Sequence, residues 1–179
     1  MKLRPLTVLL SCEHGGNKVP PEYRRLFAPH YELLQTHRGW DPGTKQLAER
    51  WQRELSCELH VATVTRLLVD LNRSPNHRSV FSEITRELPL EEKQEMLVTY
   101  HTPHRQRVIE SVKQSVASGR RVLHIGVHSF TPQLNGEVRN ADISFLYDPA
   151  SQWESELSGR WRESLRASKR EPRVRLNYP

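Results

Sequence analysis

The stretch VLLSCEHGGNKVP, Val8–Pro20, decides the fold, because a buried strand ends abruptly within it. Its apolar start, together with Leu6, predicts a strand over residues 6–12. A carboxylate, an imidazole and two glycines follow at once, at Glu13–Gly16. Polar groups in this position are typical of an α/β sheet, in which ligands bind beyond the carboxyl ends of the strands.

The rest of the chain alternates between predicted helices and predicted strands. Helical periodicity covers 43–56, 90–118 (one long or broken helix, with Pro103 at the break) and 151–168. Strand patterns cover 60–70 (one strand or two), 121–130 and 142–148, and 20–27 reads as a turn or short helix. This alternation predicts an α/β fold with an at least partly parallel sheet, in a single domain over 1–179.

Composition fits a soluble enzyme-sized domain and excludes several other classes. The chain has 179 residues, of which 36% are hydrophobic, and no run approaches the roughly 18 apolar residues that span a bilayer. Two cysteines provide neither a disulfide framework nor a CxxC metal motif, so we expect a cytoplasmic protein. The net charge of +6 comes largely from a helical stretch over 160–175, which favours a solvated helix face over a nucleic-acid surface.

Three predicted strands end in polar residues, at 13–16, 70–74 and 126–130. Because the carboxyl ends of neighbouring parallel strands meet at one edge, these groups would converge on one crevice. His14 and His128, with one carboxylate, would then form a catalytic zinc site with an open position for water. Zinc in such a site lowers the pKa of its water and polarises a carbonyl oxygen.

Each of these residues also has a structural interpretation. His14 could cap the next turn, and His128 could be a hydrogen-bonded core histidine. Gly15–Gly16 could form an ordinary turn or could let a ligand approach the backbone. Asp41 could be the N-cap of the helix that follows it. His124 lies on the same face as His128 but deeper in the sheet, so we expect a structural role for it.

Four motifs in this order resemble the N-formylglutamate amidohydrolase family, and most closely its branch of predicted members. They are SCEHGGNKVP (11–20), HRGWDPG (37–43), TRLLVDLNRS (65–74) and HIGVHSFTP (124–132), supported by FLYDP (145–149) and RVRLNYP (173–179). The resemblance spans nearly the whole chain. Because the family is related to the zinc carboxypeptidases and aspartoacylases, it implies a three-layer α/β/α sandwich with a mixed, partly parallel central sheet.

The resemblance also implies a metal-dependent hydrolase that acts on linear amides and uses Zn²⁺ or another divalent metal. The substrate would be a small anionic N-formyl or N-acyl amino acid. His14 and His128 match the zinc-binding histidines, and Asn72 with Arg73 matches the pair that binds the substrate carboxylate. We add Arg38 as a second candidate for carboxylate binding. Ser129 is a candidate for orienting the substrate or a metal ligand.

One departure from the pattern concerns the third metal ligand. The carboxypeptidase relatives place a carboxylate three residues after the first histidine, where this chain has Asn17. The substitute would be Asp41 or Glu13, and we prefer Asp41, whose motif is shared widely in the family. Glu13 is adjacent to His14 and should point to the opposite face, so it remains the second choice and the candidate catalytic base.

A second departure is at the C-terminus. The family pattern continues past Asn177–Pro179 with a segment that carries a glutamate, the expected general base, so the resemblance implies a domain that lacks this segment. An alternative is therefore a catalytically inactive family member that acts as a small-molecule binding or regulatory protein. The acyl group, the amino acid, the native metal and the oligomeric state stay open.

Overall fold

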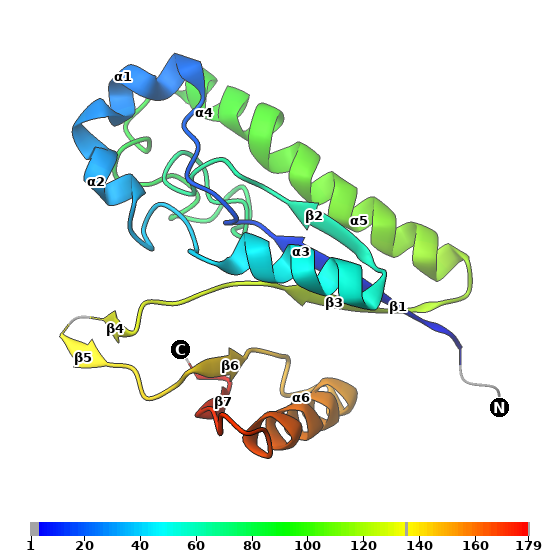
Figure 1. The fold of residues 1–179 in the computed structure, drawn as a ribbon. Helices are drawn as coiled ribbons and strands as arrows, with labels where there is room; N and C mark the ends of the chain where they lie inside the picture. Colours follow the sequence, from blue (N-terminus) through cyan, green and yellow to red (C-terminus); the bar gives the residue numbers. More distant parts are fainter. Residues whose placement is uncertain (1–3, 135, 179) are drawn as a thin grey trace. The chain divides into compact units, whose positions relative to one another are not determined.

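The computed structural model describes residues 4–134 and 136–178, which form two compact units that divide between Phe130 and Thr131. The first unit contains strands β1 (Leu6–Cys12), β2 (Glu58–Val61) and β3 (Arg121–Gly126). Its helices are α1 (Arg24–Phe27), α2 (Tyr31–Leu34), α3 (Thr44–Leu55), α4 (Leu90–Met96) and α5 (Thr102–Ala117). Short 3₁₀ turns at Pro21–Tyr23 and Ala28–His30 and a π-helical turn at Leu97–His101 connect them (Figure 1). Among these described residues, no helix has the length and apolar character that a bilayer-spanning segment needs.

The sheet of the first unit is parallel, with strand order β2-β1-β3. In the central strand, Leu10 pairs with Leu59 on one side and Ile125 on the other. All three strands therefore present their carboxyl ends at one edge. The structure confirms the predicted α/β class and the parallel pairing, whereas the three-layer sandwich stays a prediction.

Helices contact both faces of β1, which explains why this strand is almost entirely apolar. Cys12 packs with Ala48 of α3. Glu13 lies just beyond β1 on the other face, 3.8 Å from His104 of α5 (Oε1 to Nε2). Side chains alternate along a strand, so Cys12 is directed toward α3, Glu13 toward α5, and His14 again to the α3 side.

The strand predicted over 60–70 is the main error at the level of secondary structure. β2 ends at Val61, and the chain then runs irregularly through 62–70, apart from an isolated bridge between Lys18 and Val64. Leu68 and Val69 are apolar because they lie in the core beneath the N-terminal helices. A short apolar run does not by itself distinguish a strand from a buried loop.

The helix predicted over 90–118 is broken, as expected. The π-helical turn separates α4 from α5, and Pro103 lies in the first turn of α5, where its missing N–H is tolerated. The buried face of α5 carries His104 and Ser111, two turns apart. This face is polar, so α5 contributes hydrogen-bonding groups to the first unit as well as packing.

The second unit contains the remaining strands and one helix. Strands β4 (Gln133–Leu134) and β5 (Glu137–Val138) pair antiparallel, and β6 (Ile143–Phe145) pairs parallel with β7 (Val174–Leu176). Between them lies α6 (Gln152–Arg166), whose N-cap Ser151 accepts a hydrogen bond from the backbone N–H of Glu154. The helix predicted over 151–168 and the strand within 142–148 are therefore present, and the single domain stays a prediction.

The two glycines after β1 leave room for a neighbouring segment of the chain. A Cβ on Gly16 would lie 2.8 Å from the backbone oxygen of Thr63, and a Cβ on Gly15 would lie 3.0 Å from that of Ala62. The backbone N–H of Lys18 also donates to Thr63 O at 2.9 Å. Of the two interpretations of these glycines, the structure supports a close approach, but to protein backbone.

We expect Gly16→Ala to lower the free energy of unfolding by about 1–3 kcal/mol, because backbone must move to accept the methyl group. Urea unfolding followed by circular dichroism measures this change. The matched control is Gly159→Ala in α6, where a Cβ would meet no atom within 4 Å and where alanine favours the helix. Equal midpoints for the two variants would contradict the packing explanation.

Candidate metal centre

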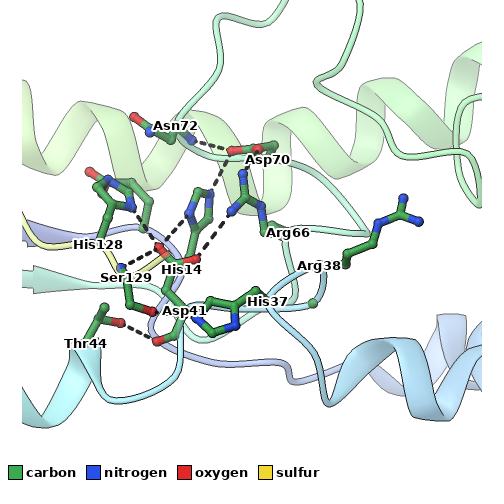
Figure 2. Close-up of polar contacts among 12 residues, drawn as sticks. His14, His37, Arg38, Asp41, Thr44, Arg66, Asp70, Asn72, His128 and Ser129 are labelled. Carbon is green, nitrogen blue, oxygen red and sulfur yellow. Dashed lines mark hydrogen bonds and ion pairs between the residues drawn. The ribbon is translucent and has the colours of Figure 1, made fainter. Parts of the chain in front are cut away.

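Three side chains from separate segments meet at the carboxyl edge of the sheet. His14 follows β1, Asp41 lies in the turn before α3, and His128 follows β3 (Figure 2). Asp41 Oδ2 lies 2.9 Å from His128 Nδ1 and 3.5 Å from His14 Nδ1. One potential ligand atom from each residue lies within 4.8 Å of the other two. The three residues predicted as metal ligands are thus brought together.

Backbone contacts direct Asp41 toward the histidines. Its N–H donates to the backbone oxygen of His14 at 2.9 Å, which ties the turn to the end of β1. Its own carbonyl accepts the hydroxyl of Thr44 at 2.6 Å. The N-cap of α3 is Gly43, which has a left-handed φ of 83°, and no side chain caps this helix. The alternative role of Asp41 as an N-cap is therefore wrong.

The central groups are buried, and Asp41 is ionised. His14 and Asp41 are 1% and 2% exposed. Burial alone would raise the pKa of Asp41, but the adjacent rings of His128 and then His14 outweigh it and hold that pKa well below its usual range. Burial alone would lower the pKa of His14, but Asp41 and Asp70 outweigh it and raise that pKa.

A second carboxylate fixes the orientation of His14. The ring donates from Nε2 to Asp70 Oδ1 at 2.8 Å. Burial favours the neutral form of Asp70, but the His14 hydrogen bond and the charges of His14 and Arg66 lower its pKa to about 2. Asp70 therefore accepts the proton on Nε2, and Nδ1 of neutral His14 carries a lone pair. That buried Nδ1 has no hydrogen-bond partner.

Glu13 contacts His128 at Nε2, the same ring nitrogen that Asp70 contacts in His14. Its Oε2 lies 3.4 Å from His128 Nε2, whereas Asp41 lies at Nδ1 of the same ring. Burial alone would raise the pKa of Glu13, but His104, Ser11 and the charge of His128 lower it to about 2. This placement supports Asp41 over Glu13 as the third ligand.

This donor set fits a divalent metal. Nδ1 of His14 and Nδ1 of His128 both point at one oxygen of Asp41. Two nitrogen lone pairs facing an anionic oxygen repel one another unless a proton or a cation lies between them. Two imidazoles and one carboxylate are also the usual protein ligands of a catalytic zinc site.

Arg66 joins the two aspartates and was not identified from the sequence. Its Nη1 lies 3.3 Å from Asp41 Oδ1, and its Nη2 donates to Asp70 Oδ2 at 3.0 Å. The erroneous strand over 60–70 concealed this contact, because residues four apart in a strand are roughly 13 Å apart. The spacing of Arg66 and Asp70 would have indicated an ion pair only if the segment had been recognised as a compact turn.

The predicted substrate-binding residues differ in their placement. The backbone N–H of Ser129 lies 3.3 Å from Asp41 Oδ2, and that of Asn72 donates to Asp70 Oδ1 at 3.0 Å. Arg73 has an exposed side chain, and its carbonyl contacts His101 Nε2. Arg38 points away from the centre (Figure 2). Its guanidinium pairs with an exposed glutamate, Glu83.

The side chain of Asn17, at the position where the relatives have a ligand, points elsewhere. Its Nδ2 donates to the backbone oxygen of Leu34 at 2.9 Å and lies 3.3 Å from Gln35 Oε1. These contacts hold the end of α2 against the segment after β1. The residue expected to be a poor zinc ligand thus has a structural role.

Comparisons with known proteins identify the family of the chain and a structural relative. The family model for N-formylglutamate amidohydrolase matches residues 6–179. The crystal structure of a gene product from Agrobacterium tumefaciens superposes with a TM-score of 0.84 and 28% identity, covering 96% of this chain and 69% of that chain. No curated protein gives a significant match. By the family match over almost its entire length, the chain belongs to the N-formylglutamate amidohydrolase family.

Proposed function

We propose that the protein is a zinc-dependent amidohydrolase that cleaves the amide of a small N-formyl or N-acyl amino acid resembling N-formylglutamate. Membership of the family supports a hydrolase of this type. The observation that carries the proposal is the convergence of His14 Nδ1, His128 Nδ1 and Asp41 Oδ2. These three residues would hold the metal, which when bound supplies a Lewis acid and lowers the pKa of a water in the open position.

Residues around the three ligands prepare them for the metal. Asp70 keeps the proton of His14 on Nε2 and leaves Nδ1 free to bind. Arg66 contacts Oδ1 of Asp41, so Oδ2 is the oxygen that remains for the ion. Arg66 also offsets the negative charge that two buried aspartates place beside each other. The base role predicted for Glu13 stays a prediction.

The substrate carboxylate is proposed to bind Arg73, with Asn72 beside it and Ser129 orienting the substrate. Arg38 is the weaker candidate of the two arginines, because its guanidinium is already paired with Glu83. Among the described residues, the guanidinium of Arg73 has no hydrogen-bond or ion-pair partner, and its side chain is exposed. Arginine suits this task because its planar group can donate two parallel hydrogen bonds to a carboxylate.

We expect the purified protein to bind about one zinc ion per chain and to hydrolyse N-formyl-L-glutamate in a reaction that chelator abolishes. His128→Ala should lose both the metal and the activity, as measured by elemental analysis and amine release. His30→Ala, far from the ligands in sequence and on a 3₁₀ turn, is the control and should retain both. Zinc binding without turnover of any N-acyl amino acid would instead favour the inactive, binding member of the family.

We expect Arg73→Ala to raise KM for the substrate roughly 10- to 100-fold, because a hydrogen bond to a charged group is worth about 1.5–3 kcal/mol. Arg38→Ala should leave KM nearly unchanged and is the matched arginine control. Steady-state kinetics over a range of substrate concentrations separates the two. A larger rise in KM for Arg38→Ala would reverse their assignment.

The Asp70 carboxylate should stabilise the metal-free fold at neutral pH but not in strong acid. Its pKa falls from an ordinary 3.8 to about 2 on folding, so its contribution is complete above about pH 4 and is lost as the pH falls through 2. We expect Asp70→Asn to cost about 2 kcal/mol at pH 6 and much less near pH 2. Urea unfolding at several pH values measures this difference, and a cost that is the same at every pH would contradict it.

A further inference from the structure

Glu13 is buried, adjacent to a ligand in sequence and in contact with another ligand in space. It is 8% exposed, and it points to the α5 side of the sheet while His14 points away from it. We propose that Glu13 is a positioning residue, which accepts the Nε2–H of His128 and so directs the Nδ1 lone pair of that ring toward the metal. His104 of α5 holds Glu13 in this position. The inference rests on the metal centre proposed above.

The first argument is geometric. Glu13 Oε2, which is buried and has no hydrogen-bond partner, lies 3.4 Å from Nε2 of His128, and Asp41 Oδ2 lies 2.9 Å from Nδ1 of the same ring. A neutral imidazole carries one N–H, and when a metal binds Nδ1 that N–H is on Nε2, where the Glu13 carboxylate is available to accept it. Nδ1 is then left as the ligand atom, directed at the same Asp41 oxygen as Nδ1 of His14.

The second argument is that a carboxylate lies beside Nε2 of both histidines. Asp70 accepts the Nε2–H of His14 at 2.8 Å, and Glu13 contacts the corresponding nitrogen of His128. A carboxylate behind each metal-binding histidine orients the ring and makes it a better donor. The two carboxylates reach the centre from different segments, one directly after β1 and one from the irregular loop after β2.

The third argument concerns what holds Glu13. His104 is 2% exposed, its Nε2 lies 3.8 Å from Glu13 Oε1, and neither of its ring nitrogens has a hydrogen-bond partner. Ser11 lies two residues earlier on the same face of β1 and also contacts the Glu13 side chain. The Ser11 hydroxyl shares a 2.8 Å hydrogen bond with Nε2 of His124. Glu13 is thus enclosed by polar groups of the sheet and α5, which restrict its rotamer.

This placement differs from that of a general base. A base must reach the proton of the attacking water, directly or through one more water. Glu13 instead contacts the nitrogen of His128 that faces away from Asp41. Loss of its charge should therefore act on the metal through His128 and lower the affinity for zinc.

The test compares Glu13→Ala, Glu13→Gln and His104→Ala by zinc affinity, determined in competition with a chromophoric chelator. We expect Glu13→Ala to bind zinc about 10- to 100-fold more weakly. Glu13→Gln, whose amide oxygen still accepts the Nε2–H, should recover much of that loss, and His104→Ala should give a smaller loss. Thermal unfolding of each variant checks its fold, and Glu13→Gln is the variant that preserves size and shape.

A further measurement is specific to positioning. Nitrogen NMR of the zinc-loaded protein should show His128 bound through Nδ1 and protonated on Nε2 in the wild type, and a mixture of the two binding modes in Glu13→Ala. The matched control is Glu58→Gln on β2, a carboxylate 3.3 Å from a different histidine, His60, which should leave zinc affinity unchanged.

The outcomes separate this inference from the proposed function. A wild-type protein that binds no zinc would overturn both. A wild type that binds zinc, with Glu13→Ala binding equally tightly and the same His128 tautomer, would overturn the positioning role alone. A kcat of Glu13→Gln reduced more than about 100-fold at unchanged zinc affinity would also overturn it and would assign Glu13 as the base.

Discussion

The buried carboxylate of Asp41 is the group on which the rest of the centre depends. An ionised carboxylate can be removed from water only if charges and hydrogen-bond donors replace the lost solvation. Both histidines and the backbone N–H of Ser129 contact Oδ2, and Arg66 contacts Oδ1. These partners come from three separate segments, so one buried anion fixes the relative positions of four stretches of chain, its own included.

The parallel sheet makes this arrangement possible. β1 pairs with both neighbours in the same direction, so the chain leaves β1 and β3 at the same edge and brings His14 and His128 together. α3 and α5 then divide the residues at the end of β1 between the two faces. Cys12 faces the apolar side, and Glu13 faces the polar side of α5. Strand alternation thus separates His14, a proposed metal ligand, from the adjacent carboxylate of Glu13.

The sequence predicted the centre better than the elements around it. Three predicted strands end in polar residues, and this pattern identified His14 and His128 as candidate ligands. The family resemblance then added Asp41. The apolar run after β2 was ambiguous because buried loops and buried strands have the same composition. Its misassignment concealed Arg66, whose contact with Asp70 requires a compact turn. The partner of Arg38 could not be predicted, because pairing across 45 residues depends on tertiary structure.

The crowding at Gly15 and Gly16 has a consequence for the chemistry as well as for packing. Their missing side chains set the distance between the segment that carries His14 and the loop from residue 61 onward. That loop continues into Arg66, which contacts Asp41, and Asp70, which orients His14. Steric contact between two backbones therefore sets how close the charged groups of Arg66 and Asp70 lie to the proposed metal ligands. A substitution that changed no charge and touched no ligand would still alter the field at the centre.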